Sequence, residues 1–378
     1  MKKILITGGA GFIGSNLALK LIDKGYRITI IDSLSEQIHG PKSVITSPLY
    51  KTVKDKVIFI QASVNSKPDL IKAISDNEII VHLAAETGTG QSMCQIERYT
   101  NVNVTGTAVL LDILVNHKHN VEKLLVASSR AVYGEGKYFS DEYGIVYPEL
   151  RTSEFMGKGD FEVKYPGCSS PLSQMPTDEN SMLHPSSVYG ITKLHQEQMV
   201  MTVCKAIKLP SVALRYQNVY GPGQSLTNPY TGILSIFSTQ IKNGNAINVF
   251  EDGKESRDFV FIDDVVDATI MSIESPNANY QIFNVGTGIP INILTVAKTL
   301  INLYNRKVPV FISGNYRLGD IRHNIADMSK IINLLGFYPR VTFEEGIKLF
   351  TQWVNNQAIQ KDNFLNSIEE MKTKGLFQ

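Results

Sequence analysis

The sequence predicts an α/β fold in which a doubly wound parallel sheet is combined with a smaller C-terminal α/β lobe. Short runs rich in β-branched residues alternate with amphipathic segments through the first third of the chain, as parallel strands with crossover helices require. The order becomes less regular after residue 221, which indicates the second lobe. With 378 residues, 43% of them hydrophobic, the chain can bury a large core.

Five strand-like runs define the first part of the sheet. They are residues 2–8, 27–33, 56–62, 78–85 and 122–129. Helices are expected at 13–25, where Gly25 ends the segment, and at 103–117. A long helix should span Val188 to Ile207, because apolar residues recur at helical spacing and Pro185 lies just ahead, and a strand should follow over 211–221.

These elements divide the chain into an expected main domain, a lobe and a tail. Residues 1–218 form the main domain, with a long insert at about 135–183 that lacks sustained periodicity. Residues 219–350 mainly form the smaller lobe, with about 259–288 returning to the main domain. Residues 351–378 are expected to be a helical tail.

Composition excludes several classes of partner. The 37 basic and 36 acidic side chains nearly cancel, so no overall field attracts nucleic acid or an anionic membrane. No stretch approaches the roughly 20 apolar residues of a membrane span, and the glycines at 8 and 9 interrupt the first apolar run before it resembles a signal peptide. Cys94, Cys168 and Cys204 are odd in number and widely spaced, which favours a reducing cytoplasm.

A glycine-rich turn joins the first strand to the first helix. Gly8, Gly11 and Gly14 allow a tight turn and the close approach of a pyrophosphate, whose charge the helix N-terminus stabilises. Asp32 ends the second strand, where a carboxylate can accept both hydroxyls of an adenosine ribose. No Arg or Lys follows it closely, so the pattern favours NAD over NADP. The alternatives are a plain turn and a solvated Asp.

Tyr189 and Lys193 form a Y-x-x-x-K motif on the long helix, one turn apart on one face. A nearby ammonium favours the phenolate, so Tyr189 can act as a general base. The motif alone is often an ordinary helix surface. It gains weight from the glycine turn and from "SSRAVYG" at 128–134.

The order of glycine turn, Asp32, "HLAA", "SSRAVYG", "YGITK" and "LRYQNVYGPGQ" resembles the extended short-chain dehydrogenases/reductases, in the branch of nucleotide-sugar epimerases and dehydratases. The resemblance runs from Lys3 to about Phe350 and implies a Rossmann fold with tightly bound NAD in the first domain, a nucleotide-sugar substrate and a homodimer formed through helices 104–117 and 188–207. The apolar faces of those helices could instead belong wholly to the core.

The resemblance also implies the site residues. The catalytic set is Ser129, Tyr189 and Lys193. The cofactor-binding set is Gly8, Gly11, Phe12, Ile13, Gly14, Asp32, Ser63, Val64, Leu83, Ala84, Ala85, Asn103, Ser128, Tyr189, Lys193 and Tyr216. The substrate-binding set is Ser129, Tyr189, Asn218, Arg257, Arg317 and Asp320. Where the family usually carries an Asp that contacts adenine, this chain has Ala62 and Ser63, and Ser63 is the candidate replacement.

Arg130 and Ala131 separate this chain from the sugar dehydratases. Those enzymes place an Asp-Glu pair directly after the catalytic hydroxyl, whereas neither Arg130 nor Ala131 readily removes a C5 proton at neutral pH. Reversible oxidation at one carbon remains. Arg130 is expected to pair with an acid of the insert; contact with the sugar is the alternative.

The insert at 135–183 resembles one found in a subgroup of these epimerases, including enzymes that act on dTDP-L-rhamnose. Many members carry a zinc knuckle there, but the four ligand positions are Ser140, Tyr143, Tyr165 and Cys168 in this chain, so we expect no metal. Seven aromatic residues are expected to pack the insert in its place, a flexible loop being the alternative. They are Tyr138, Phe139, Tyr143, Tyr147, Phe155, Phe161 and Tyr165.

The sequence therefore predicts an NAD-dependent 4-epimerase of a nucleotide-activated deoxyhexose such as dTDP-L-rhamnose. Two alternatives remain open. One is a nucleotide 4-ketosugar reductase that uses free NAD(P)H, and the other is a non-catalytic protein that binds NAD or a sugar.

Overall fold

A seven-stranded parallel sheet forms the centre of the protein, and the predicted α/β class is confirmed. The computed structural model describes residues 2–230 and 232–378. The strand order is β13-β9-β5-β4-β1-β2-β3. The strands are β1 (Lys3–Thr7), β2 (Arg27–Asp32), β3 (Ile58–Gln61), β4 (Ile79–His82), β5 (Lys123–Ser129), β9 (Ser211–Tyr216) and β13 (Gln281–Val285).

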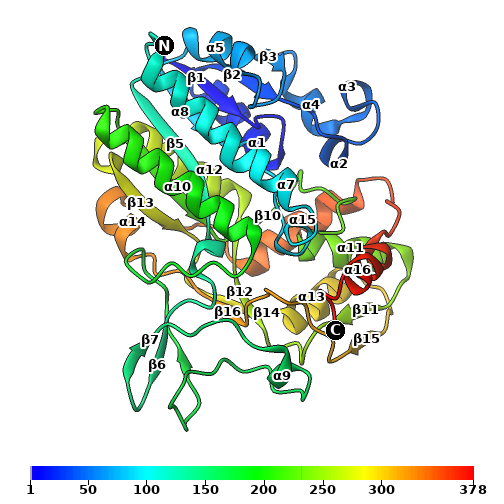
Figure 1. Ribbon diagram of the computed structural model, residues 1–378. Helices are drawn as coiled ribbons and strands as arrows, with labels where there is room; N and C mark the ends of the chain where they lie inside the picture. Colours follow the sequence, from blue (N-terminus) through cyan, green and yellow to red (C-terminus); the bar gives the residue numbers. More distant parts are fainter. Residues whose placement is uncertain (1, 231) are drawn as a thin grey trace.

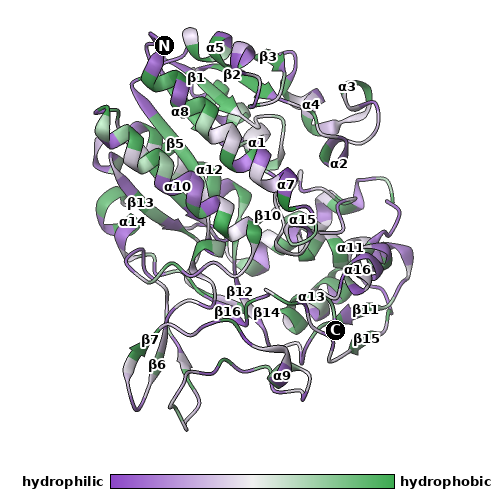
Figure 2. Ribbon diagram, viewed as in Figure 1, coloured by the Kyte–Doolittle hydropathy of each residue, from purple (hydrophilic) through white to green (hydrophobic). Residues whose placement is uncertain are grey.

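Helices cover both faces of this sheet (Figure 1). On one face lie α1 (Phe12–Asp23) and α12 (Ile262–Glu274), and on the other α5 (Lys67–Ser75), α8 (Gly106–Asn116) and α10 (Val188–Ala206). The central strands are almost wholly buried, and Figure 2 shows β5 as mainly hydrophobic. Burial on both faces explains why these strands read as continuous apolar runs.

The direction of strand addition reverses between β1 and β4. The chain adds β2 and β3 on one side of β1, and β4, β5, β9 and β13 on the other. In open parallel sheets, ligands bind at the carboxyl ends of the strands on either side of such a reversal. The glycine turn and the residues after β4 both lie there.

The smaller lobe is built on short strands. A four-stranded sheet contains β10 (Asn218–Tyr220), β12 (Ser256–Phe261), β14 (Pro290–Asn292) and β16 (His323–Asn324), and β11 (Ile247–Val249) pairs with β15 (Val310–Ile312). Its main helices are α11 (Ile233–Asn243), α13 (Ile293–Tyr304) and α15 (Phe343–Asn355). Residues 259–261, expected in the main domain, belong to this sheet because they pair with β10. The chain then continues through α12 to β13, which pairs with β9 of the main sheet.

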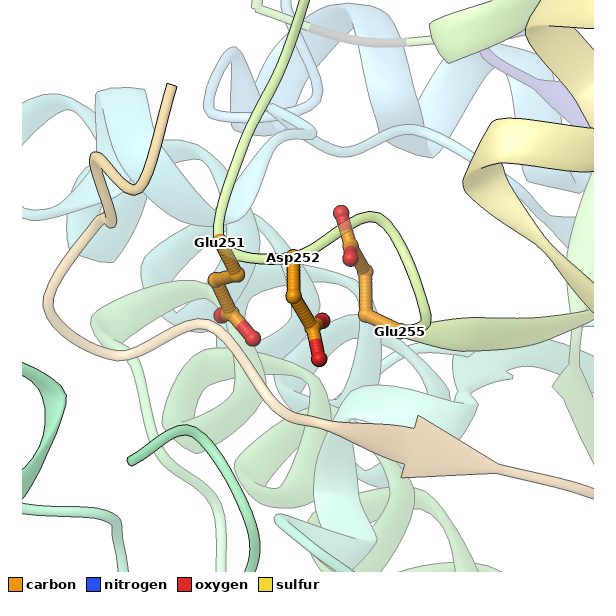
Figure 3. Close-up of side chains that lie close together, drawn as sticks. All are labelled: Glu251, Asp252 and Glu255. Carbon is orange, nitrogen blue, oxygen red and sulfur yellow. The ribbon is translucent and has the colours of Figure 1, made fainter. Parts of the chain in front are cut away.

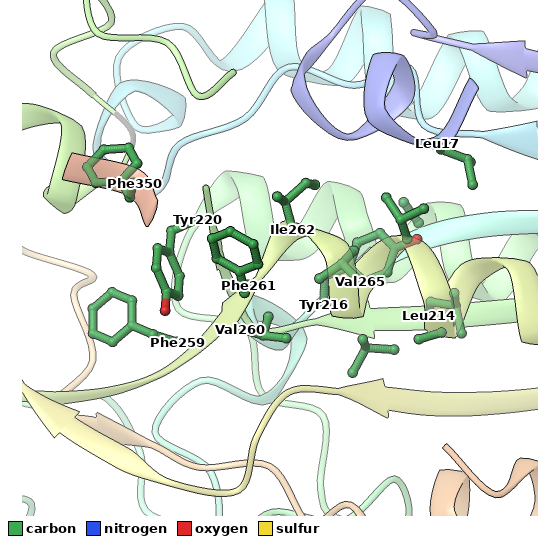
Figure 4. Close-up of a cluster of buried hydrophobic side chains, with 14 of the residues drawn as sticks. Leu17, Leu214, Tyr216, Tyr220, Phe259, Val260, Phe261, Ile262, Val265 and Phe350 are labelled. Atoms are coloured by element: carbon green, nitrogen blue, oxygen red, sulfur yellow. The ribbon is translucent and has the colours of Figure 1, made fainter. Parts of the chain in front are cut away.

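One hydrophobic core joins the main sheet to the lobe. Figure 4 shows Leu214 and Tyr216 of β9 and Val265 of α12 in the same cluster as Tyr220 and Phe259 of the lobe. Tyr220 is fully buried, and its ring packs edge-on against Phe259 at a centroid distance of 6.2 Å. The two parts are therefore interleaved around shared side chains.

Short helices complete the chain. They are α2 (Glu36–His39), α3 (Ser43–Thr46), α4 (Pro48–Val53), α6 (Thr89–Ser92), α7 (Ile96–Tyr99), α9 (Ser153–Met156), α14 (Ser329–Leu335) and α16 (Phe364–Thr373), with the 3-10 turns η2 (Arg130–Tyr133) and η3 (Pro276–Ala278). A π-helical turn, η1 (Thr100–Thr105), stands where we expected the start of an α-helix. Within the described chain, no helix combines the length and the hydrophobicity needed to cross a bilayer.

The insert forms an antiparallel sheet of β6 (Tyr138–Ser140), β7 (Gly144–Val146) and β8 (Ser173–Gln174) (Figure 1). Only part of the aromatic set packs it. Tyr138 and Phe161 are buried, whereas Phe139, Tyr143 and Phe155 are exposed. The expectation that all seven aromatics pack the insert is therefore wrong for these three.

The four knuckle positions of the insert do come together, but hydrogen bonds hold them. The Ser140 Oγ lies 3.0 Å from the Cys168 Sγ, and the rings of Tyr143 and Tyr165 are 6.0 Å apart. The Glu142 carboxylate accepts hydrogen bonds from the Ser140 hydroxyl and from the backbone N–H groups of residues 169 and 170. One thiol among these four side chains cannot build a tetrahedral zinc site.

Candidate active site

A cavity of about 540 Å³ opens at the carboxyl ends of the parallel strands and extends into the smaller lobe. Nearly all the predicted site residues line it. They are Gly8, Gly11, Phe12, Ile13, Gly14, Asp32, Ser63, Val64, Leu83, Ala84, Ala85, Ser128, Ser129, Tyr189, Lys193, Tyr216, Asn218, Arg257, Arg317 and Asp320. One cavity thus brings together residues from the whole length of the main domain and the lobe.

The glycine turn leaves no room for side chains. Gly8 has a φ of +68°, and a Cβ built on it would lie 2.8 Å from the backbone of Ala84. A Cβ on Gly14 would lie 2.5 Å from the carbonyl oxygen of Gly8. Helix α1 starts at Phe12, directly after the turn. The turn therefore fits a pyrophosphate held by backbone N–H groups at a helix N-terminus.

Asp32 is fixed at the edge of the cavity. Its two carboxylate oxygens accept the backbone N–H groups of Ala10, at 3.0 Å, and Leu34, at 2.8 Å. His39, which the sequence analysis missed, lines the same end, with its Nε2 3.8 Å from the Asp32 Oδ1. Among the described lining residues, no Lys or Arg comes from β2 or the segment after it, so this end fits the ribose diol of NAD.

Asn103 departs from expectation because it does not line the cavity. Its side chain is fully buried, accepts the backbone N–H of Glu86 at 2.7 Å and donates to the Thr192 Oγ1 at 2.9 Å. The π-helical turn η1 carries it. Asn103 therefore fixes the segment after β4 against α10, a contact between distant residues that the local pattern does not reveal.

Helix α10 presents Tyr189 and Lys193 to the cavity. The helix begins at a capped end, where the Ser187 Oγ accepts the N–H of Gly190 at 3.2 Å. Burial raises the pKa of Tyr189, while the Ser129 hydroxyl and the Arg130 charge act to lower it. Burial lowers the pKa of Lys193 to about 7. Lys193 is therefore close to a change of protonation state at neutral pH, whereas Tyr189 depends on Ser129, on nearby positive charge and on the bound cofactor to favour its phenolate.

A buried polar network supports Lys193 from behind. The Lys193 Nζ donates to the Gln196 Oε1 at 2.7 Å, and the Gln196 Nε2 donates to the Thr107 Oγ1 at 2.8 Å. His82 joins the network through Thr7 and Thr107, at 2.7 and 3.0 Å. Burial lowers the pKa of His82 to about 3, so the ring is neutral at physiological pH.

Strand β5 ends with the two serines. The Ser129 Oγ accepts the backbone N–H of Ala131 at 3.2 Å and lines the cavity beside Tyr189. Ser128 turns the other way, because its Oγ donates to the Glu197 Oε2 at 2.5 Å. Tyr216 lines the cavity with its ring, but its hydroxyl is bonded to the Thr269 Oγ1 at 2.8 Å on α12.

Two predicted arginines lie at the lobe end of the cavity. The Arg257 guanidinium is held by three backbone carbonyls, those of Ser256, Ile321 and Arg322, at 2.7 to 2.9 Å. Arg317 pairs with Asp320 at 2.7 Å. Burial acts to raise the pKa of Asp320, but Arg317 and Arg257 hold it below its ordinary value. This end therefore carries fixed positive charge suited to phosphate.

Arg130 corrects the sequence-based expectation. It lines the cavity, and its Nε donates to the Asn218 Oδ1 at 2.8 Å. Within the described residues, no carboxylate of the insert or of any other segment lies within 4.0 Å of its guanidinium. Acidic side chains of the insert form ion pairs with other residues; Glu135, for example, pairs with Arg151. The expected ion pair between Arg130 and an acid of the insert is wrong.

Three acidic side chains lie close together beside the cavity, namely Glu251, Asp252 and Glu255 (Figure 3). Two buried arginines satisfy the first two of them. Arg151 binds both carboxylate oxygens of Glu251 at 2.8 Å, and Arg322 binds Glu251 and Asp252 at 2.9 and 2.7 Å. The cluster therefore acts as a counter-charge that ties the insert to the lobe.

Two further residues line the cavity although neither was predicted as a site residue, namely Gln217 and Phe364. Gln217 is buried, and neither atom of its amide has a hydrogen-bond partner within the described chain. Phe364 of the tail helix α16 lines the cavity and stacks on Phe250, with ring centroids 6.0 Å apart. The resemblance ends near Phe350, so nothing in it pointed to α16.

Comparison with known proteins agrees with this geometry. The model of the NAD dependent epimerase/dehydratase family matches residues 4–286. The dTDP-L-rhamnose 4-epimerase of Burkholderia thailandensis is 38% identical over 361 residues, which cover 96% of this chain and 97% of that protein.

Solved structures share the fold. The UDP-glucose 4-epimerase of Thermotoga maritima, solved with UDP-glucose, has a TM-score of 0.73 at 28% identity, over 93% of this chain and 98% of that one. The UDP-glucuronic acid 4-epimerase of Bacillus cereus, solved with UDP-glucuronic acid and NAD, has a TM-score of 0.75 at 25% identity, over 93% and 99% of the two chains.

The chain therefore belongs to the NAD dependent epimerase/dehydratase family. The predicted family and the predicted cofactor, NAD, are both confirmed. The glycine turn, Asp32 and the absence of Lys and Arg from the described cavity-lining residues of β2 and the segment after it all fit that cofactor.

Proposed function

We propose that the protein is an NAD-dependent 4-epimerase of a nucleotide-activated deoxyhexose. The observation that carries the proposal is one cavity lined both by Ser129, Tyr189 and Lys193 of the main domain and by Arg257 and Arg317 at its lobe end. A sugar at the first group and a diphosphate at the second match the chemistry of a nucleotide sugar, because arginine favours phosphate.

In the proposed reaction, Tyr189 and Ser129 act on the C4 oxygen of the sugar. Tyr189, as the phenolate, accepts the proton of the C4 hydroxyl, and Ser129 donates a hydrogen bond to the oxygen as the ketone forms. NAD, when bound, accepts hydride from C4 and returns it. The ketosugar, tethered by its diphosphate, turns over between the two steps, and Tyr189 then returns the proton to the oxygen.

The positions next to Ser129 argue against dehydration. Expelling water requires a further acid and base, whereas Arg130 and Ala131 follow Ser129. Ala131 is buried, and Arg130 bonds to Asn218. Epimerisation needs neither group, because one proton acceptor serves both half-reactions.

The sugar is proposed to be a dTDP-6-deoxyhexose such as dTDP-L-rhamnose. The supporting observation is the 38% identity to a dTDP-L-rhamnose 4-epimerase over nearly the full length of both chains. Relatives named for UDP-sugars match at lower identity, for example a putative UDP-glucose 4-epimerase of Methanocaldococcus jannaschii at 29%.

Proton NMR of the purified protein with a panel of dTDP-, UDP- and GDP-sugars, with no cofactor added, tests the proposal. We expect one sugar, dTDP-L-rhamnose first among them, to convert to its C4 epimer. The matched control is Tyr189→Phe, which should retain NAD and lose conversion. A panel without any conversion by a protein that holds NAD would overturn the proposal.

Two alternatives give different results in the same experiment. A 4-ketosugar reductase would need added NAD(P)H and would consume it in equal amounts with product. A non-catalytic binding protein would bind a sugar equally well as wild type and as Tyr189→Phe, with no turnover in either.

We also propose a homodimer formed through α8 and α10. Both helices leave apolar side chains exposed on the side away from the sheet, including Val115 and Ile191. Size-exclusion chromatography with light scattering tests this, and a monomer at micromolar concentration would contradict it.

A further inference from the structure

Arg130 lines the cavity and has hydrogen-bond donors that no residue of the described chain uses. Its Nε is bonded to Asn218, but no hydrogen bond among the described residues uses either terminal amino group. These two nitrogens have no hydrogen-bond partner in the described chain, but they are not fully buried. Both therefore remain accessible from the cavity. The guanidinium is thus fixed at one edge and free at the other.

Arg130 also has no ion-pair partner among the described residues. Of the nearby acids, Asp320 is paired with Arg317 and Glu135 with Arg151. Arg257 adds a like charge from β12. Burial, followed by Arg257, lowers the pKa of Arg130 to about 9. A protein retains an unpaired cation in a cleft at a cost in folding free energy, and a bound ligand can offset that cost.

The position of Arg130 relates it to the reacting atoms. It directly follows Ser129, and its charge acts on the hydroxyl of Tyr189 from across the cavity. Lys193 lies one turn along α10 from Tyr189, and no carboxylate of the described residues is bonded to either side chain. Ser129, Tyr189 and Arg130 line the same cavity, so a hexose whose C4 oxygen reaches Ser129 and Tyr189 shares that cavity with the free edge of Arg130.

We propose that Arg130 is a further catalytic residue, which binds the oxygens of the hexose next to C4 and whose positive charge favours the Tyr189 phenolate. This inference rests on the proposed function. A hexose is favoured over the β-phosphate as the ligand because Arg130 adjoins Ser129, whereas Arg257 and Arg317 provide charge at the lobe end.

Three variants of the NAD-loaded protein test the proposal. Arg130→Met removes the charge, Arg130→Lys keeps the charge but not the planar pair of donors, and Arg306→Met removes an exposed arginine as the control. Far-UV circular dichroism checks that each folds. Calorimetry then compares the affinity for dTDP-L-rhamnose with that for dTDP alone.

We expect Arg130→Met to weaken the binding of dTDP-L-rhamnose about tenfold or more while leaving that of dTDP unchanged, as for loss of a charged hydrogen bond. The pKa of Tyr189, measured as the ultraviolet difference against Tyr189→Phe, should rise by about 1. Arg130→Lys should restore the pKa and only part of kcat. Arg306→Met should match wild type.

Other outcomes overturn the inference. Equal weakening of dTDP and the nucleotide sugar would assign Arg130 to the diphosphate, and unchanged affinity with an unchanged pKa would make its role structural. A wild-type protein that converts no sugar would refute the proposed function, whereas the Tyr189 titration would still test the electrostatic part of this inference. Should Arg130→Met not fold, Arg130→Lys alone would still separate charge from donor geometry.

Discussion

The Lys193 Nζ donates a hydrogen bond of 2.7 Å to the Gln196 Oε1, three residues further along α10. Lys193 is buried, and its neighbour in space is an amide rather than a carboxylate. Burial makes the charged form of Lys193 unfavourable and lowers its pKa to about 7. Active-site residues of this kind commonly lower the stability of the folded protein, although its activity requires them.

Lys193→Met should therefore stabilise the protein while abolishing turnover. The unfolded lysine binds a proton below about pH 10.5, but the native one only below about 7, so stability rises with pH between these values. Lys193→Met lacks this penalty. We expect its free energy of unfolding to exceed that of wild type by about 1–2 kcal/mol at pH 7, and this difference to fall toward zero near pH 10. Urea unfolding at several pH values measures the difference. Lys298→Met, an exposed lysine, is the control, and a less stable Lys193→Met would contradict the argument.

Arg215 forms a buried ion pair with Glu197, so its removal should destabilise the protein, in contrast to Lys193→Met. Arg215 binds both oxygens of Glu197, at 2.5 and 2.9 Å, and its Nη1 donates to the Tyr133 hydroxyl at 2.8 Å. Arg215→Met leaves a buried carboxylate without its counter-charge, so we expect a loss of about 3–5 kcal/mol in the free energy of unfolding. Lys2→Met, which breaks an exposed pair with Glu122, should change it by less than about 1 kcal/mol. Similar losses in both variants would refute the distinction.

A side chain in the glycine turn should weaken the binding of NAD while leaving the catalytic residues in place. A Cβ on Gly14 would lie 2.5 Å from the Gly8 carbonyl oxygen, so Gly14→Ala should displace the turn. We expect the NAD released from the denatured variant to fall at least about tenfold per chain, as measured by chromatography. Gly25→Asn is the control, because Gly25 has a positive φ and nothing within 4 Å of an added Cβ. Full retention of NAD by Gly14→Ala would show that the turn does not hold it.

The parts of the structure that could be predicted are those with a local pattern. The glycine turn, the buried strands and the Y-x-x-x-K face each have a period or a spacing that a single segment carries. The spacing of Tyr189 and Lys193 predicts that they share a helix face, the family resemblance adds Ser129, and all three line one cavity.

Contacts between distant segments could not be predicted in the same way. The role of Asn103 depends on Glu86 and Thr192, and the insert is anchored by Arg151 to Glu251, one hundred residues away. Arg130 shows the limit most clearly. An acid of the insert was its expected partner, yet Glu135 binds Arg151 instead, and only the three-dimensional structure reveals which partner each charge takes.

The insert offers a last prediction, which concerns Glu142. Hydrogen bonds from the Ser140 hydroxyl, from the backbone N–H of Ser170 and from the hydroxyl and backbone N–H of Ser169 lower the pKa of Glu142 to about 2. The carboxylate therefore supports the turn fully above about pH 4.5, and this support is lost as the pH falls through about 2. We expect the amide hydrogen-exchange protection of Ser169 and Ser170, corrected for intrinsic rates, to decrease over this range.

The same turn in Glu142→Gln has no charge to lose. Its protection should be lower than in wild type at neutral pH and nearly constant down to pH 2, whereas Glu154→Gln, which removes only an exposed partner of Lys158, should behave like wild type. Because the four knuckle positions are joined by Ser140 and Cys168 at 3.0 Å and by the Glu142 carboxylate, addition of zinc should change neither curve. A zinc-dependent rise in protection would show that the segment binds metal after all, and pH-independent protection in wild type would show that Glu142 does not hold the turn.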